Sequence, residues 1–406
     1  MAVQESRRLR ASVRLTGEGH RVTTLELLFD LVFVFAITQI TTFMAGDLSG
    51  RGMLRSVVLL ALLWWSWCSY AWLGNQAKAD EGVLRASLLT AMAGMFVVGL
   101  AIPEAWRDAA GGLAAPIVLA VALSVVRLGH LAVYFVAAAG DPGLRRQLVR
   151  TAIPVATAAG ILVAGACVGG PAQTALWVLA LAIDYVGVYA VGSDGWRLHS
   201  AAHFAERHGL VIIIALGESV VSLGVGVAAL PLTVAVIVAA LLGLAVTVAL
   251  WWTYFDVVAL VAERVLGRKQ GAERARLARD SYTYLHFPMV AGIIFFALGL
   301  KKVMISVADS GHHSLSDPLP TLALWALYGG VVAYLLGHLG FRMRNVHSVN
   351  WQRLAVAAAL LAAAGPAAHL PALAALALLA AVLVALIGYE AVHFREARRR
   401  IRAVGD

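Results

Sequence analysis

The sequence predicts an all-α, polytopic integral membrane protein with about twelve transmembrane helices. Of its 406 residues, 61% are hydrophobic and only 14% are charged, whereas soluble domains carry about 25% charged residues. The mean hydropathy is +0.82, and apolar stretches of about 20 residues, long enough to span a bilayer, recur along the chain. These stretches are rich in Ala and Leu and lack the alternation of barrel strands. They therefore predict helices, which satisfy their own backbone hydrogen bonds in lipid.

The apolar stretches define the predicted elements in chain order. A basic segment, 1–22, precedes them, and a basic tail, 395–406, follows them. The last two stretches are joined only by the tight, proline-containing turn AAAGPAAHLPALAA. The predicted helices are 23–44, 53–74, 83–104, 114–138, 148–168, 173–192, 204–228, 232–258, 279–304, 319–341, 351–370 and 372–394.

Lys and Arg residues predict the orientation of these helices. Five Arg residues precede the first helix, and further basic clusters lie in loops of the same side, at 145–150, 264–279, 342–344 and 395–402. By the positive-inside rule both termini are expected in the cytoplasm, which requires an even number of helices. The net charge of +9 is explained by these loops. No basic patch with interleaved aromatic residues accompanies it, so we expect no nucleic-acid partner.

Matching motifs suggest that the chain is a duplicated six-helix unit. The first half is expected over 23–192 and the second over 203–394. Because each half holds an even number of helices, the two would have the same orientation, as in parallel-repeat transporters. The matches, in chain order, are TLELLFDLVFVFAI with FAERHGLVIIIALG, Trp64-Trp65-Ser66-Trp67 with Trp251-Trp252-Thr253-Tyr254, and Arg127-Leu128-Gly129-His130 with Leu335-Leu336-Gly337-His338.

Ionisable side chains within the predicted helices are the candidate functional residues, because such groups are costly in lipid and usually face a protein interior or a watery cavity. Glu218 lies near mid-membrane, about 18 Å along the helix from Glu206. We expect a polar cavity that opens to the cytoplasm, mainly at the starts of the helices 23–44 and 204–228. The proton- or substrate-site candidates are Glu26, Asp30, His203, Glu206, Arg207, His208, Glu218 and Asp184, with His286, Tyr284 and Asp256 as secondary candidates.

Several of these groups also have structural explanations. Glu26 and Glu206 lie in first helical turns, where a carboxylate stabilises the helix by about 0.3–1 kcal/mol. Arg207 can extend to the membrane surface or pair with Glu26 or Asp30. Glu218 is the hardest to explain in this way, because a carboxylate at mid-span costs about 2.5–3.5 kcal/mol.

Histidines raise the question of a metal site. His203, Glu206 and His208 are of ligand types that suit zinc, manganese or iron, but their spacing differs from the HExxH pattern, and His208 is turned away from the other two. His130 and His338 each follow a glycine and are expected to hydrogen-bond between helices. We therefore predict no cofactor and treat His203, Glu206 and His208 as weak metal-ligand candidates.

Two stretches, LELLFDLVFVFAITQI and HFAERHGLVIIIALGESVV, resemble the signature segments of the bacterial low temperature requirement A family. The resemblance continues through WWSWCSYAWLGN and YLHFPMVAGIIFFALGLK and so covers nearly the whole chain. It implies a multi-pass protein of the bacterial cytoplasmic (inner) membrane that is linked to growth in the cold. It implies no particular substrate, cofactor or reaction. The signature positions in this sequence are Glu26, Asp30, His203, Glu206, Arg207, Gly209, Gly217 and Glu218.

Three classes of function fit these observations. The first is a secondary transporter or permease, coupled to protons, in which Glu218 carries the proton because burial raises the pKa of a carboxyl group. Its partners would be membrane lipid and a small polar substrate or a proton. The second is a membrane-embedded, metal-dependent enzyme acting on a lipid or isoprenoid. The third is a non-catalytic sensor of the state of the membrane.

Overall fold

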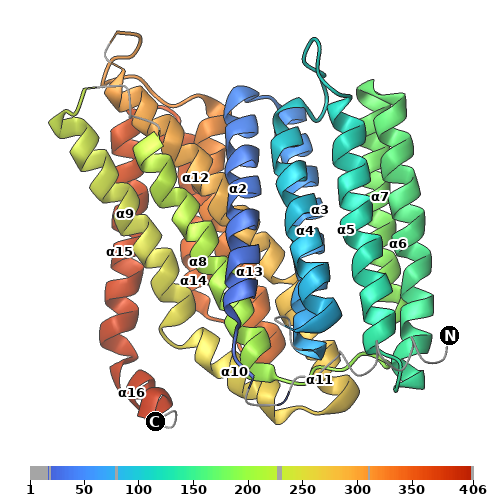
Figure 1. The fold of residues 1–406 in the computed structure, drawn as a ribbon. Helices are drawn as coiled ribbons and strands as arrows, with labels where there is room; N and C mark the ends of the chain where they lie inside the picture. The colour runs from blue at the N-terminus through green and yellow to red at the C-terminus, as the bar shows by residue number, and fades with distance from the viewer. Residues whose placement is uncertain (1–16, 18–19, 78–80, 226–230, 310, 404–406) are drawn as a thin grey trace. The chain divides into compact units, whose positions relative to one another are not determined.

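The computed structural model describes residues 17, 20–77, 81–225, 231–309 and 311–403 (Figure 1). Most of the predicted basic segment 1–22 lies outside the described residues, as do the last residues of the predicted helix 204–228 and of the tail 395–406. Within the described residues the named elements are all helical. The all-α prediction is therefore confirmed.

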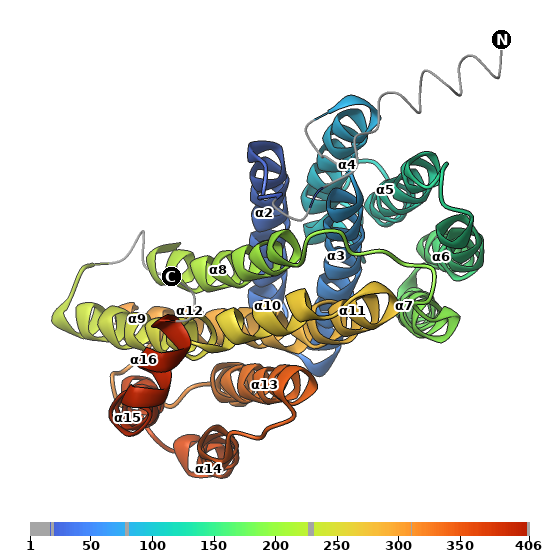
Figure 2. The same ribbon diagram turned by 90° about the horizontal axis from the view of Figure 1, so that it is seen from below.

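The helices form two compact units, of which unit 1 comprises the described residues of Met1–Phe43, Gly50–Arg207 and Leu266–Thr283. Within it, α4 packs against α5, α5 against α6 and α6 against α7, and α3 packs against α5 and α7 (Figure 2). The bounds in this part of the chain are α2 (Thr24–Gly46), α3 (Gly50–Gln76), α4 (Gly82–Ala101), η1 (Ile102–Glu104), α5 (Ala115–Ala137), α6 (Pro142–Val168), α7 (Gly170–Val191), α11 (Gly271–Leu277) and η2 (Ala278–Tyr284).

Unit 2 comprises the described residues of Met44–Ser49, His208–Val265 and Tyr284–Asp406. In this unit α12 packs against α9, α13 and α15, while α14 packs against α13 and α15. Glycines allow α12 and α13 to approach closely, since a Cβ on Gly292 would lie 2.5 Å from the carbonyl oxygen of Gly330. Such small-residue contacts are typical of helix packing in membranes. The bounds are α9 (Val234–Phe255), α10 (Val258–Arg268), α12 (His286–Ala308), α13 (Thr321–Val346), α14 (Trp351–Ala367), α15 (Ala372–His393) and α16 (Arg395–Ala403).

The helix α8 (Ala201–Val225) begins in unit 1 and continues in unit 2, with the division between Arg207 and His208. The sequence placed the boundary between halves before residue 203, whereas unit 1 also includes 203–207 and 266–283. These units are defined by compactness and do not test a duplication. The internal repeat stays a prediction.

Among the described residues, 11 stretches of helix are long and apolar enough to cross a membrane. Each lies on a predicted span, and the remaining prediction, 351–370, corresponds to α14, which has 17 residues. Its length of about 26 Å is slightly less than a hydrocarbon core of about 30 Å. Large apolar side chains such as Ile153 and Val186 are 67% and 64% exposed in mid-helix, as expected for a surface that faces lipid. The chain is a multi-pass membrane protein by these criteria.

Candidate functional site

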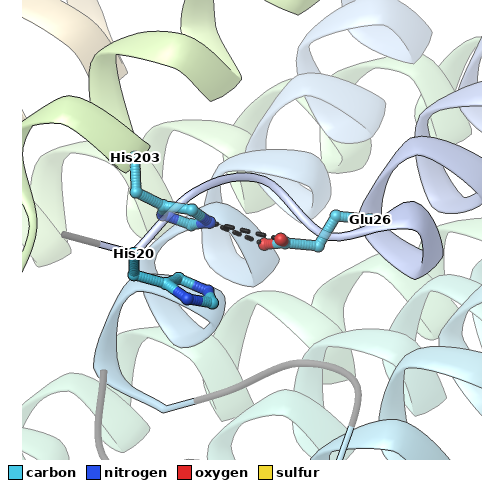
Figure 3. A group of neighbouring side chains, drawn as sticks. All are labelled: His20, Glu26 and His203. Carbon is cyan, nitrogen blue, oxygen red and sulfur yellow. Dashed lines mark hydrogen bonds and ion pairs between the residues drawn. The ribbon is translucent and has the colours of Figure 1, made fainter. Parts of the chain in front are cut away.

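A buried polar cluster joins the starts of α2 and α8 within unit 1. We call Glu26, Asp30, His203 and Arg207 the α2–α8 cluster. Nε2 of His203 lies 3.1 and 3.2 Å from the two carboxylate oxygens of Glu26 (Figure 3). The backbone N–H and the hydroxyl of Thr23 also donate to Glu26, at 2.9 and 3.0 Å. The Glu26 carboxylate therefore binds a neighbouring helix as well as the first turn of its own.

A glycine on α3 makes room for this carboxylate. A Cβ at Gly74 would lie 2.5 Å from Oε1 of Glu26 and 3.9 Å from the ring of His203. Any larger residue at this position would displace the Glu26–His203 contact. The exposed fractions of Glu26 and His203 are 1% and 0%, so the contact is shielded from solvent.

The second contact of the cluster is an ion pair one helical turn further along. Nη2 of Arg207 lies 3.0 Å from Oδ1 of Asp30, which also accepts a 2.8 Å hydrogen bond from Nε1 of Trp67. The Arg207 guanidinium lies over the Trp67 ring, 5.3 Å from its centroid. Of the two environments considered for Arg207, the structure shows pairing with Asp30 and burial, with 1% exposed.

This ion pair leaves polar atoms without partners. Nε and Nη1 of Arg207 and Oδ2 of Asp30 are buried, and none has a hydrogen-bond partner among the described residues. Buried polar atoms are usually paired, because an unmade hydrogen bond costs about 1–3 kcal/mol. The cluster thus retains hydrogen-bonding capacity that the described chain does not use.

Asn75 fixes the tautomer of His203. Its Oδ1 accepts from the backbone N–H groups of His199 and Ser200, at 2.8 and 3.3 Å, and its Nδ2 donates to the carbonyl of Ser200 at 2.6 Å. These backbone contacts set the orientation of the amide, so Nδ2 also faces Nδ1 of His203, at 3.3 Å. Nδ1 is then an acceptor, and Nε2 carries the proton that is donated to Glu26.

The same tautomer bears on metal binding. His20, Glu26 and His203 have potential ligand atoms within 4.8 Å of one another (Figure 3). A metal at Nε2 of His203 would need a lone pair there and a proton on Nδ1, which faces the donor Nδ2 of Asn75. The donor set has suitable spacing, but the hydrogen bonds around His203 disfavour a metal. Glu206 and His208, the other weak ligand candidates, do not belong to this group.

The other candidate residues of α8 are Glu206, His208 and Glu218. Glu206 is half-buried, and its Oε2 accepts from the backbone of Val22 at 3.4 Å. His208 is buried in unit 2, with its ring centroid 5.2 Å from that of His286. Glu218 is also in unit 2 and is only 3% exposed. Because α8 runs from Ala201 to Val225, Glu218 lies in its second half, and its position at the middle of the membrane stays a prediction.

The secondary candidates belong to unit 2, where their contacts have a structural character. Nε2 of His286 lies 2.9 Å from the hydroxyl of Tyr254, and Tyr284 is half-buried. Asp256 forms ion pairs with Arg398 and Arg402 of α16. Asp256 therefore attaches the basic C-terminal helix to the end of α9.

A second candidate site is a cavity inside unit 1. It differs from the expected cavity at the starts of the helices 23–44 and 204–228, because α3, α5, α6, α7, the loop after α7 and η2 surround it. We call it the tryptophan cavity after Trp65, Trp72 and Trp196, which line it. The π-helical segment η2 contributes Arg279 and Thr283. Such irregular helical turns are frequent at functional sites.

Arg127 connects this cavity to Asp184, the candidate of α7. Arg127 lines the tryptophan cavity and also an adjoining cavity that Asp184 lines. Its Nη2 lies 2.6 Å from Oδ2 of Asp184, and the two side chains are each 11% exposed. Arg127 also donates to the hydroxyl of Ser69. A buried charge pair thus lies at the edge of a cavity within apolar helices.

Three of the buried polar atoms at these cavities have no hydrogen-bond partner in the described parts of the chain. They are Oδ1 of Asp184, Nε2 of His130 and Oγ1 of Thr151, none of which has a hydrogen-bond partner among the described residues. The last two residues line the tryptophan cavity itself and are 6% and 4% exposed. A polar ligand in this cavity would supply the missing hydrogen bonds.

Comparison with known proteins now places the chain in a family. The family described as "Bacterial low temperature requirement A protein (LtrA)" matches residues 21–388. The chain belongs to this family. An uncharacterized protein of Rhizobium meliloti (strain 1021) is 26% identical over 328 residues, which cover 77% of this chain and 75% of the relative. No solved structure matches the chain.

Sequence reasoning missed several of the site residues of this LtrA-family chain. Arg127 was used only as part of a repeat motif, although it is a charge within a predicted span, which is itself a signal of function. Asn75 is uncharged and gave no comparable signal. Arg279 was assigned to an orienting loop, because the π-helical turn that carries it into unit 1 leaves no pattern in the sequence.

Proposed function

We propose that this protein is a secondary transporter that moves a small organic anion together with a proton. The ion pair between Arg127 and Asp184 carries the proposal, because it borders a cavity within helices long and apolar enough to span a membrane. Intramembrane charges are expensive and typically mark substrate or ion pathways. The family membership and the helical fold are compatible with such a role and do not specify it.

In this proposal, anion transport is coupled to proton transport because the charges of Arg127 and Asp184 must stay compensated. With Asp184 ionised and no anion bound, Arg127 is neutralised by Asp184. When Asp184 accepts a proton, the Arg127 cation needs a new partner, and a substrate anion supplies it. A proton without the anion leaves an uncompensated positive charge, and the anion without the proton leaves a negative one. Because uncompensated buried charge is strongly unfavourable, the two species enter and leave together.

Other signature residues have subordinate roles in this proposal. Glu218 remains a second candidate for carrying the coupling proton, because it is a buried carboxylate in the second half of α8. Asp30 and Arg207 retain unused hydrogen-bonding atoms and are candidates for lining the substrate path. Glu26 and His203 form the hydrogen-bonded contact that positions the starts of α2 and α8.

A metal-dependent enzyme is less well supported than a transporter, since Asn75 directs a donor at Nδ1 of His203. We expect purified protein incubated with zinc and desalted to retain less than one equivalent, and His203→Gln to leave that amount unchanged. Stoichiometric zinc that is lost in His203→Gln would restore the enzyme hypothesis.

We further propose that the protein resides in the bacterial cytoplasmic membrane with both termini in the cytoplasm. The distribution of Lys and Arg supports this orientation. Fluorescent-protein and alkaline-phosphatase fusions to the C-terminus test it, because the former fluoresces only in the cytoplasm and the latter is active only outside it. An active phosphatase fusion would contradict the orientation.

Proton movement across vesicles tests the transport function. Purified protein is reconstituted into proteoliposomes that contain a pH-sensitive dye, and aliphatic and aromatic sulfonates are added outside. Sulfonates stay ionised, so they do not carry protons across lipid as neutral acids. We expect at least one to acidify the lumen faster than in protein-free vesicles.

Substitutions of the two residues of the ion pair should have different effects on anion uptake and on acidification. Arg127→Gln is expected to abolish both anion uptake and acidification, whereas Asp184→Asn should retain anion binding and lose acidification. Glu218→Gln assigns the proton between the two carboxylates, because acidification that survives in this variant excludes Glu218 as the carrier. If no anion moves protons with the wild-type protein, the proposed function is wrong.

A further inference from the structure

We infer that the tryptophan cavity binds aromatic acids that carry a hydroxyl or N–H donor on the ring. This inference rests on the proposed function and names its substrate class. It is built from three features of the cavity wall, namely two arginines, three indole rings and two buried polar atoms without partners. All of them belong to unit 1.

The arginines define an anionic group on the ligand. Arg127 and Arg279 both line the cavity, and a guanidinium matches a carboxylate in a bidentate geometry. Each arginine has an aspartate partner, since Arg279 donates to Asp280 at 2.7 and 2.9 Å and Arg127 to Asp184 at 2.6 Å. Asp184 but not Asp280 lines a cavity next to the site, so Arg127 is the arginine that can exchange its partner for a ligand.

The tryptophans define a planar, apolar body. Trp72 and Trp196 lie with ring centroids 5.7 Å apart, and Trp65 is stacked on Tyr185 at 4.0 Å. Nε1 of Trp72 donates to the hydroxyl of Thr283 at 2.9 Å, which holds this ring against η2. Aromatic rings gain about 0.5–1.5 kcal/mol per ring contact beyond their burial. An inorganic anion would leave these walls unused.

His130 defines the additional donor. Nε2 of His130 has no hydrogen-bond partner among the described residues, and the backbone of Ser69 lies near the ring, so we assign the proton of the neutral ring to Nδ1. A neutral imidazole that donates from Nδ1 has a lone pair on Nε2. Nε2 therefore accepts a hydrogen bond from a hydroxyl or N–H group, and it would repel a second carboxylate. The hydroxyl of Thr151 lies in the same lining and can complete the contact.

Binding to the purified, detergent-solubilised full chain tests the inference without requiring transport. Equilibrium dialysis compares radiolabelled 4-hydroxybenzoate with three analogues, each of which lacks one feature: 4-hydroxybenzamide lacks the charge, benzoate the hydroxyl and hexanoate the ring. We expect the amide to bind more than about tenfold more weakly, because charge-assisted hydrogen bonds contribute about 1.5–3 kcal/mol. Benzoate should bind about 2- to 10-fold more weakly, as expected for one neutral hydrogen bond.

Variants connect these preferences to the cavity. Arg127→Gln should abolish binding of 4-hydroxybenzoate, and His130→Phe should bind it and benzoate equally. Arg55→Gln is the matched control, because Arg55 also lies over a tryptophan, Trp106 at 4.9 Å, outside the tryptophan cavity. Arg55→Gln should retain the preferences of the wild type.

The outcomes separate this inference from the proposed function. Equal or absent binding of all four compounds to the wild type would overturn the substrate class, while proton-coupled uptake of an aliphatic sulfonate would still support transport. Selective binding of 4-hydroxybenzoate, with no proton movement in vesicles for any anion, would support the binding site and contradict transport. The ligand series uses the wild-type protein, so it stays decisive if a variant fails to fold.

Discussion

Arg127–Asp184 in unit 1 and Arg353–Glu390 in unit 2 are both ion pairs between helices with little solvent exposure, but their surroundings differ. The side chains of Arg127 and Asp184 are each 11% exposed, and those of Arg353 and Glu390 are 6% and 7% exposed. The first pair adjoins two cavities and leaves Oδ1 of Asp184 without a partner among the described residues. In the second pair, every guanidinium nitrogen of Arg353 and both carboxylate oxygens of Glu390 are hydrogen-bonded.

Arg353 uses every nitrogen of its guanidinium. Nε and Nη2 donate to the two carboxylate oxygens of Glu390, at 2.8 and 2.7 Å, and Nη1 donates to the carbonyl of Thr253 at 2.8 Å. Asn350 adds a 3.0 Å hydrogen bond to Glu390, and His338 lies 3.0 Å from Nη1. Low exposure alone therefore does not separate the pair to which we assign a structural role from the pair that we propose to be functional. The two pairs differ in how fully their hydrogen bonds are satisfied among the described residues.

The two ion pairs should differ most in their effect on stability when the carboxylate of each pair is removed. Glu390→Ala leaves Arg353 as an uncompensated buried charge, so we expect a loss of about 3–5 kcal/mol in the free energy of unfolding. Asp184→Ala should cost less, because water in the adjoining cavity can solvate Arg127. Thermal unfolding in detergent compares the two variants. Greater destabilisation by Asp184→Ala would reverse the assignment of roles.

Replacing both members of an ion pair tests separately whether the pair is needed for stability and whether it is needed for uptake. In Arg353→Met with Glu390→Met, the two apolar side chains fill similar volumes, and such replacements are often neutral or stabilising. We expect the double variant to recover most of the stability that Glu390→Ala loses, with proton-coupled uptake intact. The matched Arg127→Met with Asp184→Met should be folded but inactive. Uptake by the latter protein would exclude the pair from the mechanism.

Asn75 organises unit 1 in the way that Asn350 organises unit 2, and its removal should have an intermediate effect. Asn75→Ala leaves the buried backbone groups of His199 and Ser200 without side-chain partners, at a cost of about 1–3 kcal/mol. The melting temperature measures this loss. Asn75→Asp should be at least as damaging, because a carboxylate has no donor for the carbonyl of Ser200. A stable Asn75→Asp would show that the amide donor is dispensable.

We expect the smallest effects on stability from substitutions of Trp64 and Trp251, two tryptophans that the repeat motifs align. Trp64 is 0% exposed, and its Nε1 donates to the carbonyl of Thr283 at 2.8 Å, whereas Trp251 is 43% exposed. Trp64→Phe should cost at least the hydrogen bond, about 0.5–1.5 kcal/mol, and Trp251→Phe almost nothing. Equal shifts in melting temperature for the two variants would contradict this difference.

The fold was largely predictable, because the length and apolar composition of a membrane-spanning helix can be recognised in the sequence. Even the short α14 was expected, from apolar residues on both sides of a proline turn. The division into compact units was not predicted, since 266–278 reads as a basic loop and 279–283 as the start of the predicted helix 279–304. Only in three dimensions does the π-helical segment η2 bring Arg279 and Thr283 to the tryptophan cavity.

The candidate site was predictable only in part. The charges of α2 and α8 stand out in apolar surroundings, and the pairing of Arg207 with Asp30 was among the alternatives considered. Asn75 acts through hydrogen bonds to backbone groups, which a sequence pattern does not reveal. The sequence also could not show that every guanidinium nitrogen of Arg353 is hydrogen-bonded, while Oδ1 of Asp184 has no partner in the part of the chain that the structure describes. Partners from distant helices decide that difference.

Proton uptake on anion binding tests the central claim most directly. Purified protein in weakly buffered detergent solution at neutral pH is mixed with 4-hydroxybenzenesulfonate, whose anionic group does not titrate, and the change in pH is measured alongside the amount bound. The exchange of partners at Arg127 predicts uptake of about one proton per bound anion, and binding without uptake in Asp184→Asn. Binding to the wild type without proton uptake, or equal uptake by Asp184→Asn, would contradict it.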